Sequence, residues 1–393
     1  MSDVVILAAK RTPIGKFQGG LSQLPATELG AHVIRASLAE AGLSADVVDE
    51  VMMGMVLPAG AGQAPARQAA LKAGLPPKVA ALTINKVCGS GLKAVMLASQ
   101  AIRCGDQSVI VAGGMECMSR APWLIERTLT GLGNKSLVDS MMRDGLQSPT
   151  DGSAMGDVAE RLAKRLGITR AELDAFACES HRRATVAIHE TQFQDEIVPI
   201  TVSQRQRPDG SPFVTDEGPR TDCSIEGLAK LKPAFIEGGI ITAGNSASIS
   251  DGAAAVVLAS SDYAENHQHQ PLAQIVASVT SGLAPEDLFE APVEAIRMLL
   301  AKTKHQVSDI DLWEINEAFA AQMIACQRPL KIASERLNIR GGAIALGHPI
   351  GASGARVLTT LVHALRQENK ELGVASLCLG GGNAVAMLIR RLS

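Results

Sequence analysis

The chain has 393 residues, of which 46% are apolar and only 3% aromatic, and its formal net charge is −3. This length and apolar content are typical of a folded enzyme with two or three domains. The near-neutral charge and the lack of a basic run provide no general attraction for nucleic acid or anionic lipid, so we expect neither nucleic acid nor a membrane as a partner.

The cysteines and the apolar stretches indicate the compartment. Seven cysteines are widely spaced and contain no Cys-x-x-Cys pair, and no secretory leader precedes the first predicted strand. Both features favour a reducing cytoplasm. No apolar stretch reaches the roughly 20 residues that a membrane-spanning helix needs.

The first part of the chain alternates between predicted strands and helices. An apolar run at 4–9 predicts a buried strand, and the helical apolar spacing over 29–38 ends at Gly42, a residue type favoured at helix C-caps. The alternation then continues through strands and helices at 50–56, 67–73, 81–87, 91–103 and 108–112. This pattern predicts an α/β fold with a mainly parallel sheet.

The middle of the chain breaks this rhythm. A mixture rich in Gly, Met and Ser begins near Ser119, and a long helical region follows in which Thr169 and Glu172 have the spacing of a capping box. We therefore expect three units. Two are α/β halves, at 1–118 and 250–393, and the third is an inserted lobe at 119–249.

The second half repeats the pattern of the first. The strand predicted at 309–315 corresponds to 50–56, and the turn and helix at 347–365 correspond to 87–102. Such a duplication places Cys88 and His348 at equivalent helix starts.

Cys88 is the most informative residue of the chain. It lies in segment 85–92 (NKVCGSGL), where an apolar strand is expected to turn into an amphipathic helix. Backbone amides and the positive end of that helix would favour its thiolate. Gly89 and Gly91 would let a substrate carbonyl approach and leave N–H groups free for its oxyanion. The alternative is an inert buried thiol, which is the more common state of cysteine.

Two further glycine-rich segments supply what a nucleophile needs. His348 lies in segment 347–354 (GHPIGASG), where a neutral imidazole could take the thiol proton, or could simply bond to a loop carbonyl. Cys378 precedes glycines 380–382, so its thiol could exchange a proton with a carbon acid, or could end a buried strand. If the halves pack together, these segments would share one cleft.

Other motifs carry less information. Asn316, in segment 313–320 (WEINEAFA), could cap a helix, or its amide could fix a water or polarise a carbonyl. Neither a Gly-x-Gly-x-x-Gly nor a P-loop follows the first strand, which disfavours nucleotide-dependent oxidoreduction and NTP hydrolysis. The remaining histidines lack the spacing of metal ligands, so we expect no metal site.

These segments, in this order and across essentially the whole chain, resemble the thiolase family, and within it the acetyl-CoA acetyltransferase branch. Further matching stretches lie at 11–15 (RTPIG), 242–245 (TAGN), 251–255 (DGAAA) and 341–346 (GGAIAL). The resemblance implies a five-layered α/β/α/β/α fold of two repeated halves with an inserted loop domain that covers coenzyme A. It also implies a homodimer or homotetramer, a small-molecule acyl-CoA as substrate, and no tightly bound cofactor.

The resemblance also implies residue roles. Cys88 would be the nucleophile that is acylated, His348 the base that activates it, and Cys378 the acid or base at the α-carbon of the second acyl-CoA. Asn316, through a water, and His348 would hold the enolate oxygen, and the amides of Cys88 and Gly380 the thioester oxygen. The implied reaction joins two acyl-CoA molecules, such as acetyl-CoA, to a 3-ketoacyl-CoA and CoA, or reverses that step.

Contacts to coenzyme A follow from the same resemblance. For the two arginines among them, a solvated surface cation is an equally good explanation. The implied contacts are Arg220, Arg183, Met155, Ala243, Gly244, Ala318 and Phe319.

Several positions depart from the common family pattern, and they alter the expected wall of the acyl pocket. Ala154 and Ala247 remove polar contacts, and Leu288-Phe289 replaces a frequent Met-Gly. Cys117 and the pair Asn383-Ala384 are further departures. Two alternatives therefore remain: a thiolase for longer or branched chains, and a thiolase-like protein that binds acyl-CoA with little turnover. The intact Cys88, His348 and Cys378 favour an enzyme.

Overall fold

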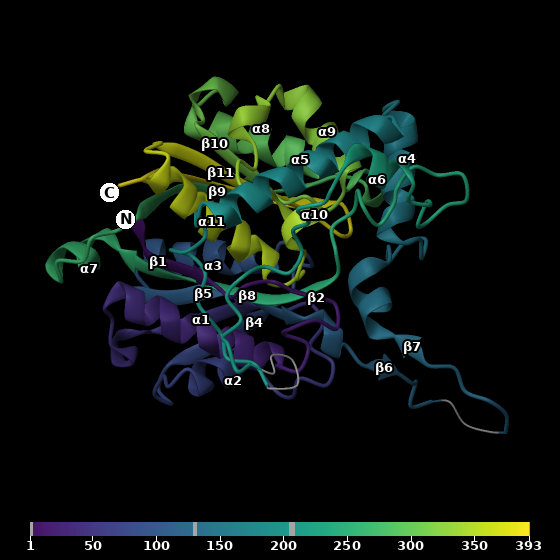
Figure 1. Cartoon of the computed structure of the whole chain (residues 1–393). Coiled ribbons are helices and arrows are strands. Elements are labelled where there is room, and N and C mark those ends of the chain that lie inside the picture. The colour runs from purple at the N-terminus through teal and green to yellow at the C-terminus, as the bar shows by residue number, and fades with distance from the viewer. Residues whose placement is uncertain (1–2, 129–131, 204–208, 393) are drawn as a thin grey trace.

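A ten-stranded sheet extends through the molecule, in a computed structural model that describes residues 3–128, 132–203 and 209–392 (Figure 1). Its strands are β1 (Val4–Arg11), β2 (Gly15–Lys16), β3 (Glu50–Gly54), β4 (Ala80–Ile84), β5 (Val109–Cys117), β8 (Ser250–Ser260), β9 (Ala273–Gly282), β10 (Leu312–Ile315), β11 (Leu372–Leu379) and β12 (Asn383–Arg391). Their order is β4-β3-β5-β8-β1-β9-β12-β11-β10, with β2 paired to β8.

The prediction of a mainly parallel sheet is wrong. Parallel pairing joins β3 to β4 and β5, and β10 to β11. The other ladders of this sheet, over the described residues, are antiparallel, and β8 returns from the insert to lie between β1 and β5. Strands that are buried on both faces are continuously apolar whichever way they pair, so the sequence pattern carries no sign of direction.

Helices cover both faces of each half of this sheet. They are α1 (Ala26–Ala41), α2 (Pro65–Lys72), α3 (Ser90–Cys104), α7 (Ser261–Asn266), α8 (Ala291–Thr303), α9 (Ala320–Leu330), α10 (Ala343–Leu346) and α11 (Ser353–Gln367). α1 and α2 pack on the outside of the half that contains β5, and α8 and α9 on the outside of the half that contains β11. α3 and α11 lie between the halves (Figure 1). The predicted five-layered α/β/α/β/α fold is therefore confirmed.

The segment between β5 and β8 forms most of the remaining structure. It contains β6 (Trp123–Leu124), β7 (Val138–Asp139), a π-helix (Met142–Leu146), α4 (Met155–Arg165), α5 (Arg170–His189) and α6 (Ile225–Ala229). β6 and β7 pair in an arm that extends away from the body (Figure 1). The predicted capping box at the start of α5 is confirmed, because Thr169 and Glu172 each accept the other's backbone N–H. α4 and α5 pack against α9, beside the second half.

Two glycines let α3 and α11 approach at their N-termini. A Cβ on Gly91 would lie 2.7 Å from the backbone nitrogen of Ala355, and a Cβ on Gly354 would lie 2.3 Å from that of Leu92. Both distances are shorter than a side-chain carbon tolerates, so only glycine permits this contact. The close contact brings together the chain segments that carry Cys88 and His348.

Candidate functional site

The turn between β4 and α3 holds Cys88 through a dense set of local hydrogen bonds. Asn85 Oδ1 accepts the N–H of Val87, which has a left-handed backbone with φ of 47°. The Ser90 hydroxyl donates to the carbonyl of Val87 at 2.7 Å and accepts the N–H of Lys86 at 2.8 Å. These bonds shape the turn between the end of β4 at Ile84 and the start of α3 at Ser90.

The glycines beside Cys88 also have a packing role, which the sequence analysis did not predict. A Cβ on Gly89 would lie 2.3 Å from the side chain of Leu379, so this residue lets the turn rest on β11. Gly91 makes the contact between α3 and α11 described above. Both glycines therefore bring the halves of the molecule together.

One apolar cavity of about 80 Å³ receives residues from three distant parts of the chain. Cys88 enters from the β4–α3 turn, His348 from the segment before α11, and Cys378 and Gly380 from the end of β11. The complete lining is Val87, Cys88, Gly145, Leu146, Met155, Ala247, Leu288, Phe289, Ala318, Phe319, His348, Ile350, Cys378 and Gly380.

Cys88 rests in this cavity as a neutral thiol, which corrects the expectation of a favoured thiolate. Burial, with a small contribution from the nearby carboxylate of Glu116, raises the pKa of Cys88 to about 12. The backbone amides of Cys88 and Gly380 lower the pKa, as a site for negative charge requires, but they do not offset the loss of solvation. A base is therefore needed when the sulfur attacks.

His348 is suited to act as that base. Burial, with a smaller contribution from Arg356, lowers the pKa of His348 to about 3, so the ring is neutral near pH 7. Its Nδ1 lies 2.6 Å from the Ser353 hydroxyl, and the backbone N–H of His348 donates to the carbonyl of Ser248. The loop is thus held at both the ring and the backbone.

Cys378 is buried at the end of β11, in the same apolar environment. Burial raises the pKa of Cys378 well above its ordinary value, and the neighbouring Cys88 raises it further. The glycines that follow form the tight connection to β12, with positive φ of 82° at Gly381 and 88° at Gly382. Gly380 rests against Val87, so the turn after β11 lies directly beside the Cys88 turn.

Asn316 follows β10 and does not cap a helix, because α9 begins only at Ala320 with Phe319 in the capping position. Its backbone N–H instead donates to the carbonyl of Ser376, two residues before Cys378 in β11. The Nδ2 atom of Asn316 lies 3.5 Å from both ring nitrogens of His348. Its buried Oδ1 has no partner among the described residues, which suits a bound water.

Glu116 is a residue at this site whose importance sequence reasoning missed. Its carboxylate accepts the N–H groups of Val56 at 2.8 Å, Gly351 at 3.0 Å and Leu57 at 3.3 Å. It therefore ties the His348 loop to the loop after β3. Burial raises the pKa of Glu116 to about 7 despite these hydrogen bonds. The available signal was an acidic residue near the end of a strand that is otherwise apolar or glycine.

The predicted coenzyme A contacts fall into separate groups. Met155, Ala318 and Phe319 line the cavity. Ala243 and Gly244 lie outside this lining, and Gly244 packs closely on Leu228 of α6.

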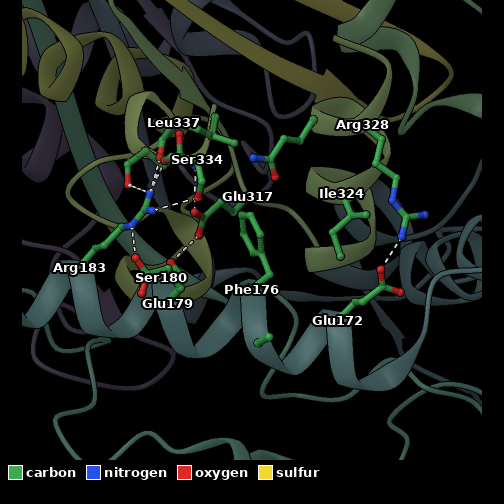
Figure 2. Close-up of a pocket in the computed structure, with 13 residues that line it drawn as sticks. Glu172, Phe176, Glu179, Ser180, Arg183, Glu317, Ile324, Arg328, Ser334 and Leu337 are labelled. Atoms are coloured by element: carbon green, nitrogen blue, oxygen red, sulfur yellow. Dashed lines mark hydrogen bonds and ion pairs between the residues drawn. The ribbon is translucent and has the colours of Figure 1, made fainter. Parts of the chain in front are cut away.

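The two predicted arginine contacts lie in different places. Arg220 is exposed, and its backbone N–H donates to Nδ1 of His181. Arg183 faces a different pocket, of about 430 Å³, between α5 and α9 (Figure 2). Its guanidinium pairs with Glu179 and donates to the carbonyls of Ser334 and Leu337. The structure therefore does not bring Arg183 to the cavity that contains Cys88.

A cluster of metal ligands and a membrane-spanning helix are both absent from the described part of the chain. No three His, Cys, Asp or Glu side chains there are placed to share a metal ion. None of the helices within residues 3–128, 132–203 and 209–392 is long and apolar enough to cross a membrane.

Comparisons with known proteins agree over the whole chain. Family models described as "Thiolase, N-terminal domain" and "Thiolase, C-terminal domain" match residues 4–262 and 269–391. An acetyl-CoA acetyltransferase of Pseudomonas aeruginosa is 53% identical, and the alignment covers 100% of both chains. The crystal structure of the Bacillus anthracis acetyl-CoA acetyltransferase matches with a TM-score of 0.97 and 41% identity, over 100% of this chain and 99% of that chain. A thiolase from Ascaris suum, crystallised in complex with coenzyme A, matches with a TM-score of 0.93 and 40% identity, over 99% of this chain and 100% of that chain.

Proposed function

Because the chain belongs to the thiolase family, we propose that it is an acetyl-CoA acetyltransferase, which joins two acetyl-CoA molecules to acetoacetyl-CoA and CoA or catalyses the reverse cleavage. The observation that carries this proposal is the single cavity shared by Cys88, His348 and Cys378. The small volume of this cavity, about 80 Å³, suits a small acyl group.

In the first half of the reaction, Cys88 takes the acyl group. Its sulfur attacks the thioester carbonyl while Nε2 of His348 accepts the thiol proton, so a free thiolate need not accumulate. The amides of Cys88 and Gly380 hold the developing oxyanion. Collapse of the intermediate expels the thiolate of CoA, which takes the proton back from His348.

In the second half, Cys378 passes its thiol proton to the neutral ring of His348, and the resulting thiolate acts on a second acetyl-CoA. A thiol whose pKa is raised by burial has a strongly basic thiolate, which is what the weakly acidic α-carbon requires. His348, and Asn316 through a water, would hold the enolate oxygen. The enolate carbon attacks the acyl group, and Cys88 leaves as thiolate. His348 returns its proton to Cys88, and Cys378 keeps the proton taken from the α-carbon, so both thiols and the neutral ring are restored.

The binding of coenzyme A is part of the same proposal. We assign residues 119–249 as the lobe that covers coenzyme A. In the chain, this lobe is inserted between the halves 1–118 and 250–393. Met155, Ala318 and Phe319 would contact the pantetheine end at the cavity, and Ala243 and Gly244 would contact it further out. The exposed Arg220 would meet the adenine or the phosphates. Arg183 would first have to leave its partners, so we assign it to holding α5 against the segment around Ser334.

The remaining expectations concern assembly and compartment. We propose a homodimer or homotetramer, supported by the edge strand β4 and by exposed apolar side chains of the arm, Trp123 and Leu137 among them. We propose a cytoplasmic location and no tightly bound cofactor. All seven cysteines are free thiols, and the chemistry needs two of them reduced, which a reducing compartment maintains.

Variants at the two cysteines test the proposal. Mass spectrometry after mixing with acetyl-CoA should detect one covalently bound acetyl group on the wild type and none on Cys88→Ser. Cys378→Ala should still be acetylated and should fail to form acetoacetyl-CoA. Cys326→Ala is the matched control, since Cys326 is also a buried thiol but lies outside the cavity, and it should retain both steps.

Two outcomes would contradict the assignment. Equal acetylation of Cys88→Ser would remove Cys88 from its role, and normal condensation by Cys378→Ala would remove Cys378. A protein that binds CoA in calorimetry yet releases no thiol from acetyl-CoA would be a binding protein instead of an enzyme.

A further inference from the structure

The cavity has two different apolar walls, one behind each catalytic sulfur. Cys378 is part of a buried cluster that includes Leu288 and Phe289. Cys88 packs against another cluster, which includes Ile350 and the partly buried Leu146. All of these residues line the same cavity. The space between the sulfurs is therefore bounded by separate sets of side chains.

The two walls would meet different parts of the substrate, an argument that rests on the proposed function. An acyl group bonded to Cys88 extends its chain from that sulfur, along the wall that contains Leu146 and Ile350. The α-carbon of the second acyl-CoA must lie within reach of Cys378 to lose its proton. A substituent on that α-carbon would therefore press against the wall that contains Leu288 and Phe289.

Phe289 and Phe319 are the bulkiest side chains in the wall behind Cys378, and Phe289 is held in place. It is 2% exposed, and its ring packs edge-on against that of Phe319, with centroids 5.3 Å apart at 69°. Its carbonyl accepts a hydrogen bond from the buried thiol of Cys326 at 3.5 Å. A ring fixed in this way cannot move aside without disturbing a close-packed core.

We propose that Phe289 makes the enzyme selective for acyl-CoA substrates without a substituent at the α-carbon. The ring occupies the space that an α-methyl group would need, whereas the wall with Leu146 limits the length of the chain on Cys88. Selectivity for α-branching and selectivity for chain length are thus set by different residues.

The test compares thiolysis of acetoacetyl-CoA with thiolysis of 2-methylacetoacetyl-CoA. One methyl group in an apolar pocket changes kcat/KM by about 10- to 200-fold, so the wild type should prefer the unsubstituted substrate at least about tenfold. Phe289→Leu should reduce this preference, and Phe289→Ala should reduce it further. The graded pair keeps the test informative if the alanine variant folds poorly, and a ratio of two kcat/KM values is independent of the folded fraction.

Leu146→Ala is the matched control, because it enlarges the opposite wall. It should improve cleavage of 3-ketohexanoyl-CoA relative to acetoacetyl-CoA and leave the α-methyl preference unchanged. The inference is overturned if Phe289→Leu and Phe289→Ala keep the wild-type α-methyl preference, or if Leu146→Ala lowers that preference equally. A wild-type protein that cleaves none of the three substrates would refute the proposed function, which is a separate outcome.

Discussion

Nδ1 of His348 lies 2.6 Å from Oγ of Ser353, while the Ser353 hydroxyl donates its proton to the carbonyl of Pro349 at 2.9 Å. A hydroxyl has one proton, so Ser353 accepts a hydrogen bond from Nδ1–H of the neutral ring. The proton on Nδ1 leaves the lone pair on Nε2 free. Ser353 therefore selects the tautomer that a base for Cys88 requires.

Removal of the Ser353 hydroxyl should slow acylation. In Ser353→Ala the ring loses its partner at Nδ1 and can adopt the other tautomer, whose Nε2 cannot accept a proton. A hydrogen bond of about 1 to 1.5 kcal/mol corresponds to a fall in acylation rate of about tenfold. Rapid-quench measurement of acetyl transfer to Cys88 would report this rate directly.

Ser37→Ala provides the control for that variant. Ser37 is also buried and also donates its hydroxyl proton to a carbonyl, that of Ala255, but it lies on α1 away from the cavity. The Ser37→Ala substitution should lower the free energy of unfolding about as much as Ser353→Ala does, without slowing acylation. An unchanged acylation rate in Ser353→Ala would show that this serine does not set the tautomer.

The acylation rate should lack the fall at acidic pH that protonation of a histidine base usually causes. Because the pKa of His348 is lowered to about 3, the ring is already neutral at pH 5, and the rate should not fall between pH 8 and pH 5. Since the pKa of Cys88 is raised to about 12, its ionisation adds no rise over this range either. The observable is kcat/KM for the first half-reaction between pH 5 and pH 9.

Glu116 should produce the one inflection in that profile. Its pKa is raised to about 7, so it is mainly protonated below pH 7 and mainly negative above. A negative charge there disfavours the thiolate character of Cys88, so the rate should decline modestly above pH 7. Glu116→Gln, which cannot ionise, should abolish the decline. A loss of activity on the acidic side that persists in Glu116→Gln would show that His348 titrates near its ordinary pKa.

Asn316 should matter in the second half-reaction alone. In Asn316→Ala the water that would stabilise the enolate loses its site, and loss of one oxyanion donor costs about 100- to 1,000-fold in rate. Condensation should fall by about this factor while acetylation of Cys88 stays near the wild-type rate. Mass spectrometry of the acetyl-enzyme reports acetylation, and a steady-state assay reports condensation. An equal fall in the rates of both steps would contradict the assignment.

Arg11 should be essential for stability and for the segment that leads to Arg220. Its guanidinium pairs with Asp216 through two hydrogen bonds of 2.7 and 2.9 Å, and with Glu196 at 2.5 Å, where all three side chains are buried. Arg11→Ala leaves two buried carboxylates without the guanidinium that pairs with both, which should lower the free energy of unfolding by about 3 to 5 kcal/mol. Urea denaturation measures this loss.

The Arg11 variant has a matched surface control and a second readout. Arg161 pairs with Asp151 where both side chains are about half exposed, so Arg161→Ala should change stability little. At temperatures where Arg11→Ala is folded, its KM for acetyl-CoA should rise, because Asp216 anchors the chain just before Arg220. An unaltered KM would place Arg220 outside the binding site.

Some features of the fold could be predicted from the local sequence because they depend on residues that are neighbours in the chain. Apolar periodicity and backbone hydrogen bonding within a few residues predict three such features. They are the strand β1, the helix cap at Gly42, and the capping box of Thr169 and Glu172. The pairing direction of the strands was not readable. It depends on which buried strands lie side by side, and β8 joins β1 and β5 only after a long insert.

The sequence by itself determined the chemical groups, namely two thiols, an imidazole and glycine-rich turns in a recognisable order. Only the tertiary structure decided their states. Burial, which is set by side chains far apart in the chain, keeps Cys88 protonated against the effect of the backbone amides of Cys88 and Gly380. Burial also keeps His348 neutral. The roles of Gly91, Glu116 and Ser353 likewise depend on contacts across the fold, since a residue's solvation and partners are properties of its surroundings in space.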